Sequence, residues 1–340
     1  MIYKNEIICL KLLEKGPFFD EHLILFSFEN VKSPKLSLRA MKKSLITLSS
    51  LDEKMVMYEL EIRTNIRHPF LVNQVFAFQD YDYLYYITEY APVQILRSDI
   101  LPKKFSLEMV RFYAAEIFSC LRYLHSKRQN YTFLCPKNLL LGADGHIKLN
   151  YSFCNCLEYS MEELIENVEY SSYDYLKNKR FSYLSDYWSL GLVVYEMTMG
   201  YTPFAEPCLN KIICEMQKCE PEITDMVDPI LKDFILLLLD KELETKYPKC
   251  SLLEKAIETH PFFSQIDFKR LEQKGYEPPI IIKVPEYDLK DSPKLDALYT
   301  TDFIAGDLTD GYGRIFSSYY TVNFLGAKRP KFKERFPQVS

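Results

Sequence analysis

One stretch, residues 131–154, constrains the fold of this chain more than any other part of its 340 residues. It reads YTFLCPKNLLLGADGHIKLNYSFC, and two runs rich in strand-forming residues, 138–141 and 146–150, flank Gly-Ala-Asp-Gly at 142–145. Asp-Gly favours the backbone conformations of a tight turn, so the stretch predicts a β-hairpin. The interpretation of the other segments depends on their spacing from this hairpin.

The same stretch resembles the catalytic loop and the metal loop of protein kinases, where the family reads YRDLKPENLLL and then GHIKLTDFG. Pro136, Asn138 and the spacing to the hairpin match this pattern. The residues of the chemistry differ. Thr132, Phe133 and Cys135 stand in place of the Arg, the catalytic Asp and the Lys, and Tyr151, Ser152 and Phe153 stand in place of Asp-Phe-Gly.

Phosphoryl transfer needs an acceptor for the substrate proton and a carboxylate that holds Mg²⁺ on the phosphates. A Phe ring accepts no proton, and a Tyr phenol, with a pKa of roughly 10, is a poor ligand for a hard cation. We therefore expect no catalytic residues, no metal site and no enzyme activity. The expected cofactor is none, although weak, metal-independent ATP binding is compatible with the retained positions.

Four positions resemble those of a kinase nucleotide pocket. Lys42, in the motif LRAMK, resembles the strand lysine that grips phosphates, and Glu59, on a predicted helix, resembles its ion-pair partner. Thr88 takes the gatekeeper position and Asn138 belongs to the catalytic loop. The resemblance implies a Lys42–Glu59 ion pair, kept either for nucleotide binding or because it ties the helix to the sheet.

The phosphate loop of kinases is represented by residues 14–19, EKGPFF, in which one glycine, Gly16, remains of the family's three. Further on, Ser106 is expected to begin a long amphipathic helix, and SDYWSLG at 185–191 matches the family's central helix. The resemblance implies that Asp186 receives backbone N–H groups from the catalytic loop.

The whole chain is therefore expected to have an α+β, bilobal protein kinase-like fold. A β-rich small lobe covers 1–90, an α-rich large lobe covers 91–263, and the segment 264–340 resembles the C-terminal extension of AGC-group serine/threonine kinases. In that group the extension wraps the small lobe. The expected function is that of an inactive, AGC-like pseudokinase serving as a protein-interaction, scaffold or allosteric module. The alternative is a nucleotide-binding enzyme with residual or non-standard kinase or nucleotidyl-transfer activity that uses Lys42, Glu59 and Asn138.

The composition limits the classes of binding partner that we expect. A net charge of −5 gives no strong attraction to nucleic acid or to an anionic membrane, and no apolar run approaches the ~20 residues of a membrane span. The expected partner is a protein, such as another kinase or a signalling protein. The segment 327–335 holds five basic residues that could meet an acidic partner.

Cysteine usage indicates the compartment. The nine cysteines contain no CxxC pair, which favours reduced, packed thiols over disulfides or a zinc knuckle. The start of the chain lacks the apolar core of a signal peptide. A cytoplasmic location is expected, with the nucleus as an alternative.

Overall fold

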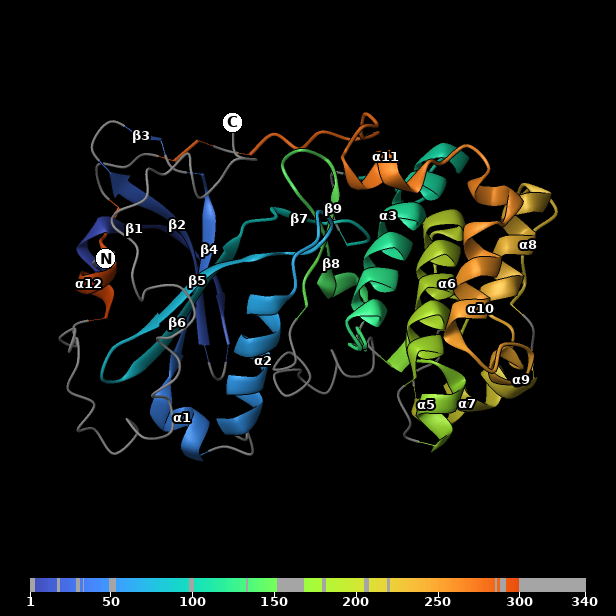
Figure 1. Ribbon diagram of the computed structural model, residues 1–340, viewed down its shortest axis with the longest axis horizontal. Helices are drawn as coiled ribbons and strands as arrows, with labels where there is room; N and C mark the ends of the chain where they lie inside the picture. The colour runs from blue at the N-terminus through green and yellow to red at the C-terminus, as the bar shows by residue number, and fades with distance from the viewer. Residues whose placement is uncertain are drawn as a thin grey trace.

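The computed structural model describes residues 4–16, 19–28, 31–32, 34–48, 53–97, 101–132, 134–151, 168–178, 182–204, 208–218, 221–284, 286–287 and 292–299. A β-sheet forms one lobe and a bundle of helices the other, with a small hairpin sheet between them (Figure 1). The expected bilobal α+β fold is confirmed.

Antiparallel strands make up the sheet of the small lobe, in the order β1-β2-β4-β6-β5, with β3 paired to β2. The short helix η1 (Lys4–Glu6) precedes them. Their bounds are β1 (Ile7–Lys15), β2 (Phe19–Phe28), β3 (Val31–Lys32), β4 (Leu36–Lys42), β5 (Gln74–Gln79) and β6 (Tyr83–Glu89).

Alternation along β4 divides the small lobe into two apolar clusters, because successive side chains of a strand point to opposite faces. Leu36, Leu38 and Ala40 pack with Ile7 of β1 on one face. Met41 packs on the other face, with residues of α2 (Glu53–Asn65) that include Leu60. The helix α1 (Lys43–Leu48) follows β4 directly.

Two long helices form the centre of the large lobe. Helix α3 (Leu107–Ser126) begins as predicted after Ser106, whose hydroxyl accepts a hydrogen bond from the backbone N–H of Met109. Helix α6 (Tyr183–Met199) begins with a capping box between Ser182 and Ser185, which satisfies two N–H groups at its start.

The remaining helices surround this pair (Figure 1). They are α5 (Tyr173–Asn178), α7 (Leu209–Lys218), α8 (Pro229–Leu238), α9 (Leu243–Lys246), α10 (Cys250–Glu258), η4 (Pro261–Phe263) and α11 (Phe268–Glu272).

The hairpin sheet, β7 (Val93–Gln94), β8 (Leu139–Leu141) and β9 (Ile147–Leu149), joins the lobes. The backbone N–H of Val72 donates to the carbonyl of Leu149 at 2.9 Å, and Leu71 forms a parallel bridge to the same residue. The segment before β5 in the small lobe is thereby hydrogen-bonded to the hairpin.

The extension returns to the small lobe at α12 (Leu295–Leu298). The N–H of Cys9 donates to the carbonyl of Pro293 at 2.9 Å, and Lys294 bridges to Ile8 of β1. Leu295 is fully buried in the apolar cluster that contains Ile7 and Leu38. Burial of such a side chain contributes about 1.5–3 kcal/mol. The extension therefore contacts the small lobe over residues 292–299.

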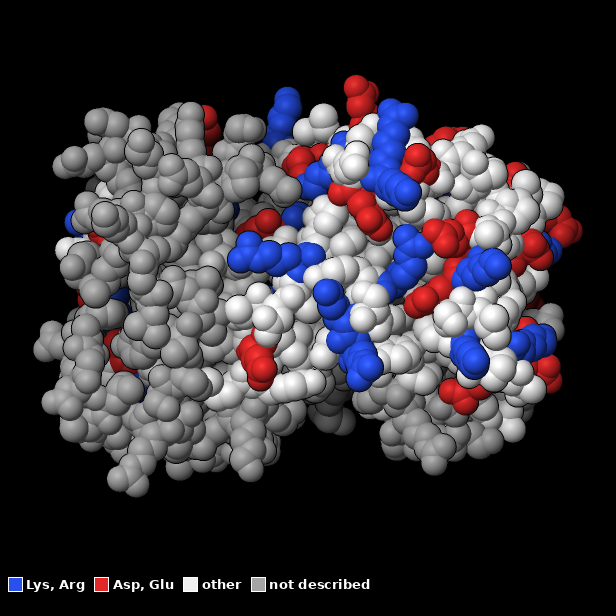
Figure 2. Space-filling view, viewed as in Figure 1, with Lys and Arg blue, Asp and Glu red and all other residues white. Residues whose placement is uncertain are grey.

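Charge is mixed over the surface that can be seen. Figure 2 shows basic and acidic side chains interspersed across the described part of one face, without a region of a single sign. Within the described residues, every helix is too short or too polar to traverse a lipid bilayer.

Candidate active site

The hairpin at the centre of the sequence interpretation forms where it was predicted, as β8 and β9. Gly145 adopts φ of +81°, in the left-handed region that other residues resist. A Cβ atom at this position would lie 1.8 Å from the carbonyl oxygen of Ile280. Glycine is needed here both for the turn and for the close approach of the extension.

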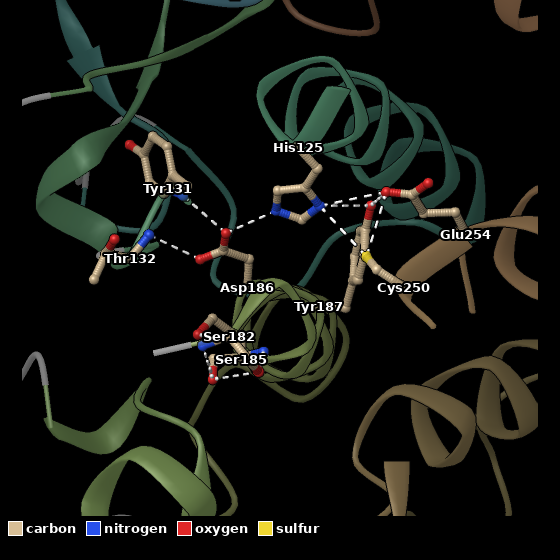
Figure 3. Close-up of polar contacts among 10 residues, drawn as sticks. His125, Tyr131, Thr132, Ser182, Ser185, Asp186, Tyr187, Cys250 and Glu254 are labelled. Carbon is tan, nitrogen blue, oxygen red and sulfur yellow. Dashed lines mark hydrogen bonds and ion pairs between the residues drawn. The ribbon is translucent and has the colours of Figure 1, made fainter. Parts of the chain in front are cut away.

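Asp186 holds the catalytic loop in place. Its carboxylate accepts the backbone N–H groups of Tyr131 and Thr132, each at 2.8 Å, and contacts Nε2 of His125 at 2.8 Å (Figure 3). The predicted role of Asp186 is confirmed. Thr132 has φ of 74°, a conformation that costs a β-branched residue of order 1–3 kcal/mol, so these bonds retain a strained backbone.

His125 connects this carboxylate to a second cluster. Burial disfavours its charged form, but hydrogen bonds with Asp186, Cys250 and Glu254 outweigh burial and raise the pKa of His125 to about 11. The imidazole is packed against the ring of Tyr183, with centroids 4.7 Å apart.

The loop after Thr132 is tied down by its own side chains. Cys135 and Asn138 are buried, and the amide Nδ2 of Asn138 lies 3.5 Å from Sγ of Cys135. The carbonyl of Asn138, at the end of η2 (Pro136–Asn138), accepts the N–H of Asn150 at 2.9 Å. Phe133, Ser152 and Phe153 lie outside the described residues.

Tyr151 occupies the position of the family's metal-binding Asp and is 2% exposed. Its hydroxyl has no hydrogen-bond partner in the part of the chain that the structure describes. Burial is the main cause that raises its pKa, and the negative charge of Glu59 adds to it although Arg63 opposes it. The group is therefore a neutral phenol at physiological pH.

The donors at these positions do not fit the Mg²⁺ ion that the family resemblance implies. Mg²⁺ is held mainly by carboxylates and phosphates. The carboxylates that act on Tyr151 include those of Glu59 and Asp186. Glu59 accepts from Nε of Arg63 at 2.6 Å, and Asp186 is committed to the loop N–H groups.

The expected Lys42–Glu59 ion pair is wrong. Lys42 is exposed at the end of β4 and shares its face with Leu38 and Ala40, opposite to the face that packs on α2. Glu59 pairs with Arg63, one helical turn further along α2. The alternation of apolar residues in LSLRAMK, which places Arg39 rather than Lys42 on the helix side, is the signal that the sequence interpretation missed.

Arg39 is the buried cation on that side of β4. Its Nε donates to Glu21 on β2 at 2.6 Å, its Nη1 donates to the hydroxyl of Tyr86 at 3.0 Å, and it lies over the ring of Phe19. Burial acts to raise the pKa of Glu21, but the charge of Arg39 and hydrogen bonds from Ser37 and Arg39 outweigh it, so the pKa lies below its usual value.

Arg63 lies beside Arg39. Both guanidinium groups lie over the ring of Tyr86, at 5.4 Å and 5.8 Å from its centroid. Nη2 of Arg63 is buried and has no hydrogen-bond partner among the described residues. Within the described part of the chain, Nη2 of Arg63 in the small lobe and the hydroxyl of Tyr151, which packs with the large-lobe core, are therefore both buried without a partner.

Thr88 is buried near the end of β6, between Ser37 on β4 and Gln74 on β5. The side-chain amide of Gln74 is buried and makes no hydrogen bond in the described structure. The next residue, Glu89, accepts from Lys148 of β9 at 2.6 Å. The three residues that lie side by side across the sheet here, Ser37, Thr88 and Gln74, are therefore all polar. The Glu89–Lys148 ion pair connects the end of β6 to the hairpin.

A second ion pair links the lobes. Nζ of Lys137, in the catalytic loop, lies 3.4 Å from Oε1 of Glu14 near the end of β1. Both side chains are partly exposed, so the pair contributes about 0–1 kcal/mol. It places the acidic residue of the degenerate phosphate loop against the catalytic loop.

Comparison with known proteins agrees with this architecture. A family model described as the protein kinase domain matches residues 28–263. A RAC family serine/threonine-protein kinase homolog of Dictyostelium discoideum is 30% identical over 254 residues, which is 72% of this chain and 55% of the relative.

Two further relatives have a similar sequence identity to this chain. A probable cAMP-dependent protein kinase catalytic subunit of Encephalitozoon cuniculi is 35% identical over 179 residues, covering 52% of this chain and 55% of the relative. Protein kinase C delta type of Homo sapiens is 30% identical over 287 residues, covering 82% and 41%. The chain spans about half the length of the curated relatives that it matches.

These matches correct the expectation that the chain is not an enzyme. The relatives carry the names of serine/threonine and cAMP-dependent protein kinases, which are enzymes. Phe133 and Tyr151 still occupy the two positions of the family's carboxylates, so an activity has to be argued from other residues. On the fold, the anchored catalytic loop, the C-terminal extension and the matched family model, the chain belongs to the protein kinase family, in its AGC group.

Proposed function

We propose that this chain is a nucleotide-binding enzyme of the protein kinase family that uses a non-standard set of residues. Arg39 takes the role of the phosphate-binding cation that the sequence had suggested for Lys42, and Glu59 and Asn138 complete the set. The proposal rests on one observation: the buried Nη2 of Arg63 has no hydrogen-bond partner in the described structure.

An unpaired buried donor costs about 1–3 kcal/mol, and more when it is charged. A phosphate oxygen beside Arg63 would satisfy this donor, and the Tyr151 hydroxyl is a second one of neutral type. Arg39 adds a planar guanidinium, which suits phosphate in a bidentate manner. We infer an anionic ligand, for which ATP or ADP is the natural candidate in this family.

The nucleotide is expected to bind without Mg²⁺, because the described side chains offer guanidinium and phenol groups to it. The reaction class is phosphoryl or nucleotidyl transfer to a protein acceptor, by analogy with the relatives' names. With free cysteines at the described positions, the cytosol or the nucleus is the compartment that we propose.

Thermal unfolding of the full chain with ATP, ADP or neither, in EDTA or in Mg²⁺, tests the binding. A ligand at one hundred times its Kd stabilises a protein by about 2.7 kcal/mol, which is measurable as a rise in Tm. We expect a rise in EDTA that Mg²⁺ does not increase. The rise should be lost in Arg39→Lys, which cannot make the bidentate contact, and kept in Lys42→Ala, its matched control.

Transfer itself is tested with γ- and α-labelled ATP and a mixture of peptide and protein acceptors. Label on an acceptor that disappears in Arg39→Lys and remains in Lys42→Ala supports the proposal. Absence of any Tm rise at millimolar nucleotide would rule it out.

An allosteric role toward a protein partner is the second candidate. It is favoured by the position of Tyr151, whose buried hydroxyl lies within the electrostatic reach of Arg63 and Glu59 on α2 and of Asp186 on α6. A charged ligand beside this hydroxyl would act on charged groups of both lobes. Crosslinking of candidate signalling proteins with and without nucleotide tests this role, and equal crosslinking in both states contradicts it.

A further inference from the structure

A group of metal-ligating side chains lies behind the catalytic loop, outside the nucleotide region. It consists of His125 at the end of α3 and Cys250 and Glu254 on α10 (Figure 3). Cys250 and Glu254 are four residues apart on one helix, so their side chains project from the same face. The site brings together residues that are 125 positions apart in the chain.

The distances among the three donor atoms are those of a metal site. Nδ1 of His125 lies 3.8 Å from Sγ of Cys250 and 3.4 Å from Oε1 of Glu254, and these last two atoms are 3.5 Å apart. In a tetrahedral zinc site with bonds of about 2.0–2.3 Å, the ligand atoms are separated by roughly 1.63 times the bond length, about 3.3–3.8 Å. All three separations fall within this range.

Hydrogen bonds also join the group. The two contacts of Sγ of Cys250, at 3.5 Å and 3.8 Å, have lengths that are usual for sulfur, whereas the 3.4 Å between Nδ1 of His125 and Oε1 of Glu254 exceeds the typical 2.7–3.2 Å. The hydroxyl of Tyr187 donates to Glu254 at 2.8 Å. That hydroxyl is also 3.2 Å from Nδ1 of His125, so it occupies the fourth side of the group.

The outer partners also match those of metal sites. A ligating histidine typically hydrogen-bonds through its other ring nitrogen to a carboxylate, which fixes the ring and raises its basicity. Here Nε2 of His125 contacts Asp186 at 2.8 Å, which turns Nδ1 toward Cys250 and Glu254 (Figure 3). The His125 side chain is 4% exposed and that of Glu254 is 20% exposed, so the group is nearest to the surface on the Glu254 side.

We propose that His125, Cys250 and Glu254 form a site for a divalent transition-metal ion, with Zn²⁺ as the preferred ion. A thiolate and an imidazole select a borderline-soft cation and disfavour Mg²⁺ and Ca²⁺. The ion replaces the thiol proton of Cys250 and any proton on Nδ1 of His125, so binding releases protons. It fastens α10 to α3 and, through His125 and Asp186, supports the strained catalytic loop.

Cobalt is the spectroscopic probe. The full chain is stripped with EDTA, dialysed and titrated with Co²⁺, which gives a thiolate-to-cobalt charge-transfer band and strong visible bands when it is bound tetrahedrally by cysteine. We expect these bands to saturate at one ion per chain and Zn²⁺, but not Mg²⁺, to remove them.

Variants locate the ion. Cys250→Ser should lose the thiolate band, Glu254→Gln should keep it but bind Co²⁺ at least about tenfold more weakly, and Cys208→Ser, at an exposed cysteine, should match the wild type. Far-UV circular dichroism without metal checks that each variant is folded. A wild-type chain without the band, or a Cys250→Ser chain that retains it, overturns the proposal.

Discussion

Arg39 and Glu21 lie directly opposite each other on β4 and β2, and Nε of Arg39 donates to Oε2 of Glu21 at 2.6 Å. This pair takes the place of the Lys42–Glu59 pair that the family resemblance implied. One pair, Arg39–Glu21, lies within the sheet and the other, Arg63–Glu59, lies within α2, and the charge of Arg63 also acts on Glu21.

Arg39→Met should lower the free energy of unfolding by about 3 kcal/mol, because it leaves the Glu21 carboxylate without its partner in a mostly buried position. Lys42→Met, at an exposed site, should change it by less than about 0.5 kcal/mol. Urea denaturation measures both. The double variant Arg39→Met/Glu21→Gln should recover part of the loss, and equal effects of the two single substitutions would contradict the assignment.

Local pattern was sufficient for some of the site. The Asp-Gly turn and Ser106 at the start of α3 are predicted from neighbouring residues. The anchoring role of Asp186, whose partners are 54 and 55 residues away, is predicted from the family resemblance. Lys42 was misassigned because its role depends on which face of β4 meets α2, a tertiary property. The motif similarity outweighed the alternation of Leu36, Leu38 and Ala40, which indicated the correct face.

The cluster of His125, Cys250 and Glu254 had no sequence signal of this kind. Cys250 and Glu254 stand four apart, but their partner His125 is more than a hundred residues earlier. No metal motif with such a separation can be recognised in a single sequence, since the packing of both α10 and α3 on α6 decides which histidine is near. The nine cysteines were accordingly interpreted as packed thiols.

Asp186→Asn should destabilise the chain by several kcal/mol, because the carboxylate accepts from two backbone N–H groups and hydrogen bonds to charged groups contribute about 1.5–3 kcal/mol each. The amide would present a donor where the loop needs an acceptor. In this variant, the rate of amide hydrogen exchange should increase most, relative to the wild type, at Tyr131 and Thr132. Asp233→Asn, at a largely exposed carboxylate, is the control, and unchanged exchange at the loop would argue against anchoring.

Gly145→Ala should cost more than about 2 kcal/mol, through the positive φ and the 1.8 Å approach of its Cβ to the Ile280 carbonyl. Gly142→Ala is the matched control in the same turn, since its closest contact would be the movable Asp144 carboxylate. Thermal denaturation compares them. Strain in the Gly145→Ala variant should also free the segment around Ile280, which limited proteolysis would detect as faster cleavage than in Gly142→Ala.

Stability should fall as the pH falls through the titration range of His68. Burial, reinforced by the charges of Lys148 and Arg122, lowers the pKa of His68 from 6.5 to about 4. The unfolded chain therefore binds a proton at a higher pH than the folded chain, and stability present above pH 6.5 is lost between 6.5 and 4. The loss amounts to about 3 kcal/mol at roughly 1.36 kcal/mol for each pH interval of one.

The measurement is the difference between wild type and His68→Asn in urea denaturation at several pH values. The asparagine oxygen can still accept the Phe70 N–H that Nδ1 accepts at 3.4 Å, but it does not titrate. The carboxylates and the other histidines contribute equally to both proteins and cancel in the difference. A difference that stays constant from about pH 7 to about pH 4 would show that His68 is not the group responsible.

Tyr151→Asp should make nucleotide stabilisation dependent on Mg²⁺. The substitution restores a hard oxygen ligand at the position where the family carries its metal-binding Asp, and Arg63 lies close enough to favour the ionised form. The loss of a buried aromatic ring will lower the stability of the unliganded chain by about 3 kcal/mol or more. The informative quantity is therefore the rise in Tm on adding ATP, measured for each variant with Mg²⁺ and with EDTA.

Tyr151→Phe is the control: it removes only a hydroxyl that has no partner in the described structure, and should leave the Mg²⁺ response unchanged. An equal ATP response of Tyr151→Asp in both solutions would mean that this position does not face the bound nucleotide.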